Sequence, residues 1–208
     1  MTVAPISDLL LGYTFLTTSF TLQQNQRVSR DKGGRAYTSD FGAPFWIATY
    51  GSVMLGHDDL VQAESQLLEL DGAMGTFWAY DTRRFQPRKH SGGAFSDVGV
   101  IASIGVNNDA VTLSGLANGF TASIGDRLSI ETDGGGRRLF SVVREDVVTV
   151  GGALTIKIRP HLPISVSVGA DVRFSKATVL MQVEPQSVET NDAGRALGTV
   201  NFKAVEVI

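Results

Sequence analysis

The stretch that decides the fold is "HDDLVQAESQLLELDG", residues 57 to 72. Its apolar residues recur at three- and four-residue spacing, the repeat of one face of an α-helix. The apolar side is Leu60, Ala63, Leu67 and Leu70, and the polar side is Gln62, Glu64, Gln66 and Glu69. Asp58 or Asp59 is placed to cap the helix or complement its dipole, and Gly72 to end it. A helix of about 13 residues is marginal alone, so we expect its apolar side to cover a sheet.

The segments on either side of this helix have the composition of strands. "FWIATYGSVML" (45 to 55) is rich in aromatic and β-branched residues. In "GTFWAYDTRRFQP" (75 to 87), Phe77 and Ala79 alternate with Trp78 and Tyr80, which predicts two different faces. We expect Trp46 and Phe77 to pack between the sheet and the helix.

The N-terminal part predicts one strand and one polar segment. "TSFTLQQNQRV" (18 to 28) alternates apolar and polar residues, as a half-buried strand does. "SRDKGGRAYTSDFGAP" (29 to 44) is polar and broken by glycine, and it contains Arg30, Lys32, Arg35 and Tyr37. A segment of this composition is either a mobile loop or a contact arm that needs a partner to become ordered.

The composition of the chain changes at the linker "RKHSGGAFSD" (88 to 97). The strand-like runs that follow are "VGVIASIGV", "AVTLSG", "DRLSIET", "RRLFSVVREDV", "ALTIKIRP", "ISVSVG" and "ADVRFSK". Their spacing predicts a small sandwich or barrel, with a hairpin turn at "TDGGG". The last segment predicts two longer strands around "ETNDAG" that return to the first domain. We therefore expect a mainly β protein: a β domain of residues 1–96 with 177–208 that carries helix 57–72, and an inserted small β-barrel or sandwich at 97–176.

Composition excludes several classes of protein. The chain has 208 residues, no cysteine and a net charge of −3. It therefore lacks disulfides and thiolate chemistry, which fits folding in a reducing cytoplasm. The first basic side chain is Arg27, so the cationic flank of a secretory signal is missing, and no apolar run has membrane-spanning length. Only Arg83, Arg84, Arg88 and Lys89 cluster, which is too small a basic footprint for nucleic-acid recognition.

No motif for catalysis, cofactor binding or metal binding stands out. His57, His90 and His161 lack metal-ligand spacing, and "DGGGRR" (133 to 138) lies between strands, unlike a phosphate-binding loop. No Gly-x-Ser-x-Gly elbow occurs. Paired carboxylates for glycoside cleavage would have to come from Asp126, Glu131, Asp133, Glu145 and Asp146, and a sugar platform from Trp46, Trp78, Tyr80 and Phe85. Solvated carboxylates and core aromatics are the commoner roles, so we expect no enzyme, no cofactor and no metal.

The order of these segments resembles minor tail proteins of long-tailed bacteriophages. "FWIATYGSVML" followed by "HDDLVQAESQLLELDGAMGTFWAYD" resembles their strand, their helix ending in Leu-x-Gly and their next strand. "SIGDRLSIET", "RRLFSVVREDV" and "GGALTIKIRPHLP" are similar to later strands of these proteins, and the resemblance covers residues 18 to 183. Pro163 stands where the family pattern has a basic residue, which leaves the end of the inserted domain undefined.

The resemblance implies a distal tail or tail-tip protein in the virion, assembled in the host cytoplasm. It implies a tail-tube-like domain that forms a homohexameric ring, with an oligosaccharide-binding-like domain on the outside. The implied partners are other copies of the chain, the tail tube protein, a tail-tip or baseplate hub protein and the tape-measure protein. DNA would pass through the lumen, and no membrane insertion is expected. The expected contact residues are Arg30, Lys32, Arg35 and Tyr37.

A glycan-binding module is the alternative function. Small barrels of the oligosaccharide-binding kind accept ligands on a strand face. The aromatic residues of segment 97–176 are Phe120, Phe140 and Phe174, without Trp or Tyr, which is poor equipment for stacking on sugars.

Overall fold

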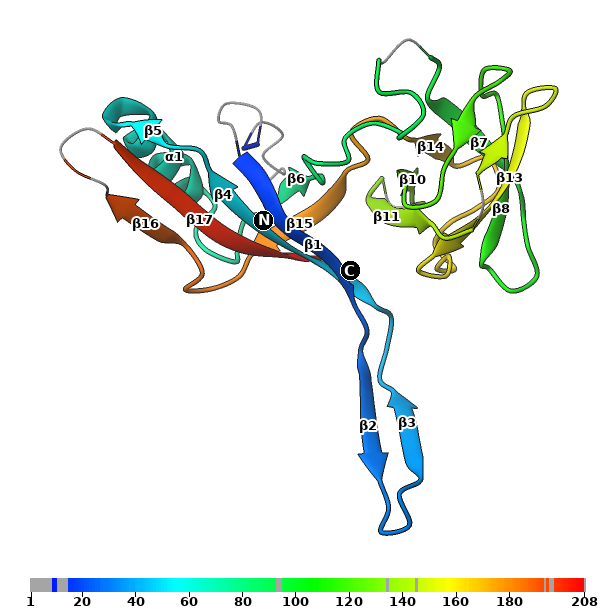
Figure 1. Ribbon diagram of the computed structural model, residues 1–208, viewed down its shortest axis with the longest axis horizontal. Coiled ribbons are helices and arrows are strands. Elements are labelled where there is room, and N and C mark those ends of the chain that lie inside the picture. Colours follow the sequence, from blue (N-terminus) through cyan, green and yellow to red (C-terminus); the bar gives the residue numbers. More distant parts are fainter. Residues whose placement is uncertain are drawn as a thin grey trace.

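The computed structural model describes residues 9–10, 15–92, 95–133, 135–144, 146–192, 194 and 197–207. Within these residues the protein is mainly β with one helix, so the predicted fold class is confirmed. The strands form two lobes, one built on a seven-stranded sheet and the other a closed barrel (Figure 1). No helix among the described residues is long and apolar enough to cross a membrane.

The sheet is antiparallel, and its longest strand lies at its centre. Its order is β1 (Phe15–Gln23), β4 (Phe45–Ser52), β17 (Leu197–Glu206), β15 (Val179–Val183) and β6 (Phe77–Ala79). Two short strands, β5 (Leu55–Gly56) and β16 (Glu189–Asp192), also pair with the first half of β17. Strands from both ends of the chain therefore build one sheet.

One face of this sheet is a continuous aromatic and aliphatic core. Phe202 of β17 lies at its centre, stacked on Tyr50 at 5.2 Å and in edge contact with Phe15 and Phe77 at 5.4 and 6.0 Å. Helix α1 (His57–Glu69) covers the same face through its buried apolar side. The helix approaches so closely that a Cβ on Gly198 would lie 2.7 Å from Leu60. Gly198 is thus required by the packing of α1 on β17.

The ends of α1 differ in detail from the sequence prediction. Its N-cap is Gly56, without a side-chain cap, and Asp58 and Asp59 lie in the first turn, where they complement the helix dipole. At the other end the helix stops at Glu69, before the predicted residue 72. Asp71 and Gly72 then both adopt positive φ, 49° and 65°. The chain therefore leaves the helix through two left-handed residues, of which only the glycine was expected.

The predicted polar segment 29–44 is a hairpin and not an irregular loop. Strands β2 (Gln26–Arg30) and β3 (Ala36–Asp40) pair over their whole length. They continue the β1–β4 ladder beyond a break, where the Phe41 N–H donates to the Asn25 carbonyl at 2.9 Å. In Figure 1 this hairpin projects alone from the end of the sheet. The predicted strand 18–28 ends inside β2, and the rest of the hairpin was not predicted as strand because its residues carry no apolar alternation.

The second lobe is a closed antiparallel barrel. Its strands are β7 (Val98–Ile104), β8 (Ala110–Ser114), β10 (Arg127–Glu131), β11 (Arg137–Val142), β13 (Ala153–Arg159) and β14 (Asp171–Arg173). A short pair, β9 (Thr121–Ala122) with β12 (Val147–Val148), lies beside it. Phe120, Phe140 and Phe174 fill the interior together with aliphatic side chains. The hairpin predicted around "TDGGG" is β10–β11, in the expected pairing.

One strand prediction and one turn prediction in the last third of the chain differ from the structure. "ISVSVG" (164–169) forms turns, with Val166 buried and Ile164 and Val168 exposed. The predicted turn "ETNDAG" contains strand β16, and Ala193 lies outside the described residues. Alternation of apolar residues identifies a strand only where a neighbouring strand is available to pair with it.

Candidate functional site

The four predicted contact residues all lie on the β2–β3 hairpin. Arg30 ends β2, Lys32 and Arg35 lie in the connecting turn, and Tyr37 lies in β3. Asp31 organises the tip, because its carboxylate accepts the Arg35 N–H at 3.0 Å and the Tyr37 hydroxyl at 3.4 Å. The turn is therefore shaped by its own hydrogen bonds, and its three cations remain exposed.

The hairpin has no packing partner among the described residues. Every residue from Gln26 to Asp40 is exposed, and Val28, Tyr37 and Phe41 each expose more than half of their surface. An isolated two-stranded hairpin is at best marginally stable in water. The hairpin therefore gains little stability from packing against the rest of the described chain.

The predicted helix–sheet residues lie in the core of the first lobe. Leu60, Ala63, Leu67, Leu70, Trp46 and Phe77 are all buried there. Trp46 differs from the others in its neighbours, because its indole N–H donates to the Leu139 carbonyl of the barrel at 2.7 Å. Leu139 itself belongs to the core of the sheet lobe. Trp46 thus joins the two lobes, in addition to filling the sheet core.

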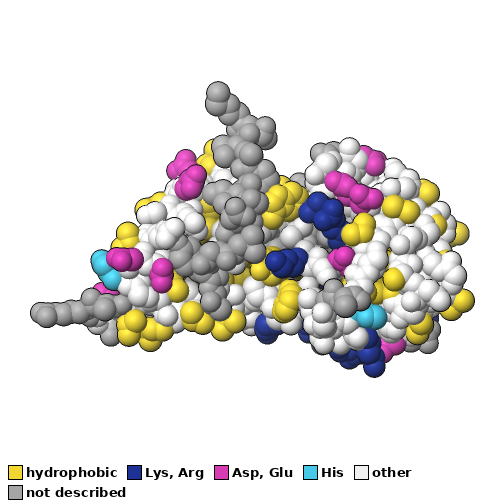
Figure 2. All heavy atoms as spheres, turned by 90° about the horizontal axis from the view of Figure 1, so that it is seen from above, with side chains coloured by type: hydrophobic (Ala, Val, Ile, Leu, Met, Phe, Trp, Pro, Cys, Tyr) yellow, Lys and Arg dark blue, Asp and Glu magenta, His cyan; other side chains and the backbone are white. Residues whose placement is uncertain are grey.

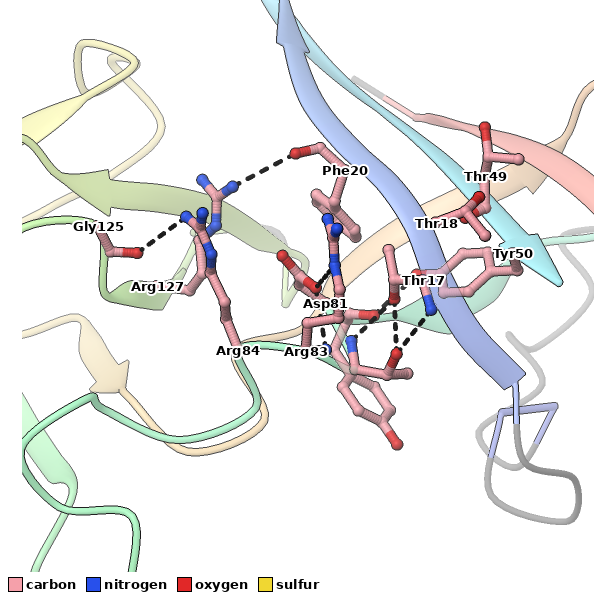
Figure 3. Close-up of polar contacts among 12 residues, drawn as sticks. Thr17, Thr18, Phe20, Thr49, Tyr50, Asp81, Arg83, Arg84, Gly125 and Arg127 are labelled. Atoms are coloured by element: carbon pink, nitrogen blue, oxygen red, sulfur yellow. Dashed lines mark hydrogen bonds and ion pairs between the residues drawn. The ribbon is translucent and has the colours of Figure 1, made fainter. Parts of the chain in front are cut away.

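A buried arginine crosses this junction from the barrel side. The Arg127 guanidinium lies 4.2 Å from the centre of the Trp46 ring and donates to the Phe20 carbonyl at 3.4 Å. Burial, reinforced by the nearby positive charges of Arg84 and Arg83, lowers the Arg127 pKa to about 10. Arg127 therefore remains a cation at neutral pH, held against the face of the Trp46 ring. Its hydrogen bond to the Phe20 carbonyl is drawn in Figure 3.

A second charged contact joins the lobes beside it. The buried Glu206 carboxylate lies 3.4 Å from Arg138 and accepts the Trp46 backbone N–H at 2.9 Å. Burial raises the pKa of Glu206, while Arg138 and the Trp46 N–H oppose the rise. Arg137 adds a contact above the Trp78 ring at 5.5 Å. These arginines were not predicted as contact residues, because an arginine at a strand end usually points to solvent.

The two edges of the sheet lobe are connected close to this junction. Residues that follow β6 return to β1, where Thr17 and Thr82 exchange hydrogen bonds between backbone N–H groups and side-chain hydroxyls at 2.8 and 2.9 Å. Next to them the Tyr50 hydroxyl donates to the Tyr80 carbonyl at 2.8 Å (Figure 3). Burial, followed by the nearby Asp81, raises the pKa of Tyr50 well above its usual value. The sheet is therefore curled, and its edge strands are tied together.

The acidic residues considered for catalysis bind the backbone of barrel loops. Asp126 accepts the N–H groups of Arg88 and Ser123 at 2.9 and 2.8 Å, and Asp146 accepts that of Ile124 at 3.1 Å. Asp126 and Asp146 are close enough to interact, and burial is the main cause of the raised Asp126 pKa. The remaining candidates are Glu131 at the end of β10, Asp133, which accepts the Ser167 hydroxyl, and Glu145, which lies outside the described residues.

The residues considered for metal or sugar binding are dispersed or buried. No group of three or more potential metal ligands occurs among the described residues. His90 is stacked on Phe120 at 4.9 Å, and the His161 Nδ1–H donates to the Asn107 carbonyl at 3.0 Å. All three phenylalanines of the inserted segment lie inside the barrel, and Phe85 is the most exposed of the four other aromatics. The described barrel surface therefore offers no aromatic platform for a sugar.

Charge is unevenly distributed over the surface of the two lobes. In Figure 2 the lobe that carries α1 shows acidic and apolar side chains, and Lys and Arg side chains gather near the boundary with the barrel. At that boundary a cleft is lined by Arg83, Arg84 and Arg88 together with Asp126. No protein-family model matches the chain, and no curated protein is significantly similar to it.

Proposed function

We propose that this chain is a structural virion protein that forms a closed ring at the distal end of a phage tail. The ring would join the tail tube to the tail tip or baseplate and give DNA a passage during ejection. The observation that carries the proposal is the β2–β3 hairpin, which extends a well-packed sheet into solvent with every residue from Gln26 to Asp40 exposed. An isolated two-stranded hairpin is marginally stable in water. Neighbouring copies in a ring would stabilise it by packing against its exposed strands.

The sheet lobe is suited to form the wall of such a ring. Helix α1 covers only one of its faces, so the other face is available to line a passage. Strands β1, β4, β15 and β17 carry only two charged residues, the buried Glu206 and the exposed Lys203. Since Lys and Arg contacts to phosphates dominate nonspecific DNA binding, a face with a single lysine lets DNA pass without strong attachment.

The remaining parts of the proposal follow the family resemblance. Residues of about 18 to 95 and 177 to 208 form the wall, and the barrel at 97–176 projects outward. The copy number is six, and the interface is heterologous, so that rotation closes the ring. The neighbours are the tail tube protein, a tail-tip or baseplate hub protein and the tape-measure protein, in a virion assembled in the host cytoplasm.

We propose a structural role and not a catalytic one. The Asp126 carboxylate accepts hydrogen bonds from two backbone N–H groups, and Asp133 accepts one from a serine hydroxyl. These bonds support a role for both carboxylates in stabilising loops. We expect no turnover of peptidoglycan or polysaccharide. Reproducible turnover that is lost in Glu131→Gln or Asp133→Asn would contradict this role.

Electron microscopy and native mass spectrometry of the full-length chain test the proposal. We expect closed rings of six copies. The matched control replaces residues 26–40 by two glycines, which should leave circular dichroism and thermal unfolding of the monomer unchanged and abolish rings. A wild-type protein that remains monomeric at every concentration tested would contradict ring formation. Rings formed equally well by the control would show that the hairpin is not the contact.

A further inference from the structure

The outer side of α1 has an unusual combination of charge and exposed apolar surface. Residues 57–76 contain five acidic side chains, Asp58, Asp59, Glu64, Glu69 and Asp71, and neither lysine nor arginine. Among them lie Val61, Leu68 and Met74, and the last two expose 78 and 81% of their surface. Exposed apolar residues surrounded by charges of one sign are typical of a contact surface.

The β2–β3 hairpin has the complementary character. Residues 26–40 contain four cations and two carboxylates, which gives them a net charge of +2. The cations are Arg27, Arg30, Lys32 and Arg35, and the carboxylates are Asp31 and Asp40. Asp31 is occupied by hydrogen bonds within the turn, so the tip presents mainly its cations. Val28, Tyr37 and Phe41 add exposed apolar surface. The hairpin is thus positive and apolar, where the outer side of α1 is negative and apolar.

The two surfaces cannot meet within one copy of the chain. In Figure 1 the hairpin projects away from the sheet lobe, and its tip lies far from α1. Each copy therefore carries both halves of a matching contact at separate places. Such a pair of surfaces produces a head-to-tail interface, which closes into a ring when the rotation between copies permits it.

We propose that the β2–β3 hairpin of one copy docks on the outer side of α1 of the next copy. Arg30, Lys32 and Arg35 face the acidic residues of the helix, and Tyr37 packs against Leu68 and Met74. This inference rests on the self-assembly proposed above and identifies the two surfaces that produce it. Because the hairpin cations and four of the five acidic side chains are exposed, assembly weakens as the screening length falls from about 8 Å at 0.15 M salt to about 3 Å at 1 M.

Cross-linking tests the contact directly, because the natural chain contains no cysteine. Lys32→Cys places a thiol at the hairpin tip, and Ser65→Cys places one on the exposed side of α1 between Val61 and Leu68. The two variants are mixed and treated with a short bis-maleimide. We expect a covalent dimer that joins positions 32 and 65. The matched control pairs Lys32→Cys with Val106→Cys, a fully exposed position on the barrel, and should give at least tenfold less dimer.

Charge reversal provides a second readout with a built-in rescue. Arg30→Glu with Arg35→Glu, or Glu64→Lys with Glu69→Lys, should each reduce the fraction of rings at least tenfold. The chain with all four substitutions should regain rings, because its two surfaces are again complementary. Arg173→Glu, on the barrel, is the control and should leave assembly unchanged.

The possible outcomes separate this inference from the proposed function. Rings that survive both reversals, without a 32–65 cross-link, would overturn the hairpin–helix contact and leave ring formation intact. Absence of any self-association would overturn both. Cross-linked open chains without closed rings would support the contact and contradict the ring.

Discussion

The molecule contains two hairpins with the same local construction and opposite surroundings. In β2–β3 and in β10–β11, five residue pairs form the ladder, and a turn of about five residues joins the strands. Every residue of the first is exposed, whereas β10 is buried over its first four residues. Local pairing therefore does not determine how a hairpin is stabilised. The β10–β11 hairpin is packed within its own chain, and for the β2–β3 hairpin we propose that neighbouring copies supply the packing.

The first arginine of each hairpin shows the same contrast. Arg27 is exposed, whereas Arg127 lies against the Trp46 ring and is 8% exposed. Arg127 joins the two lobes because the sheet lobe places the Trp46 ring and the Phe20 carbonyl beside it.

The largest effect is expected from a charge placed in the ladder of the barrel hairpin. Leu128→Asp buries an unpaired carboxylate and removes apolar contacts inside the barrel, which should lower the free energy of unfolding by about 4 kcal/mol or more. Val28→Asp, in the exposed hairpin, should change it by less than about 0.5 kcal/mol. Urea denaturation of the monomer measures both. Similar losses in the two variants would remove the distinction between the hairpins.

The next effect extends the comparison to adjacent residues of α1. Leu67 is buried against the sheet, and Leu68 is exposed. Leu67→Asp should lower the free energy of unfolding by about 3 kcal/mol, because its carboxylate enters the core. Leu68→Asp should leave thermal unfolding of the monomer unchanged. If Leu67→Asp were as stable as the parent, α1 would not pack on the sheet as described.

A moderate effect is expected at the joint between the lobes. Arg127→Ala loses the stacking on Trp46 and the bond to Phe20, partly offset by relief of a buried charge, so we expect a loss of about 2 kcal/mol. Arg127→Met keeps the aliphatic contact and should lose less. Arg27→Ala should be neutral in urea denaturation of the monomer. A neutral Arg127→Ala would mean that the stacked arginine does not stabilise the junction.

The smallest effect concerns pH. Burial raises the pKa of Glu206 above its ordinary value of 4.5. A carboxyl with a raised folded-state pKa stabilises the fold fully below its unfolded value, and this contribution is lost as pH rises through the folded pKa. The free energy of unfolding of Glu206→Gln should therefore fall less than that of the parent as pH rises from 4.5 towards 7. Parallel pH profiles would indicate that Glu206 is not held in this way.

The sequence predicts most of the regular fold because its signals are periodic. The helical repeat around Leu67 and the alternation around Phe77 report burial on one side of an element, and both residues are buried. The predicted strand 18–28 covers only the first three residues of β2, and β3 and β16 were not predicted as strands, because their residues are exposed and lack alternation. The segment at Ile164 alternates without becoming a strand. Periodicity thus reports burial and not strand pairing.

The candidate site was predicted only in part. The positions of Arg30, Lys32, Arg35 and Tyr37 on one projecting element follow from their closeness in sequence. The joint between lobes does not, because it brings together Trp46, Arg127 and Glu206 from distant segments. Nothing in the local sequence separates Arg127 from Arg27, since burial of either depends on a surface formed elsewhere in the chain.

Hydrogen exchange of the two hairpins tests the central claim most directly. Backbone amides of β2–β3 and β10–β11 are compared by mass spectrometry in the dilute monomer and in the concentrated, assembled protein. We predict that residues 26–40 exchange rapidly in the monomer and become protected on assembly, while residues 127–142 are protected in both. Equal exchange of residues 26–40 in the two samples would contradict the claim that neighbouring copies complete this hairpin.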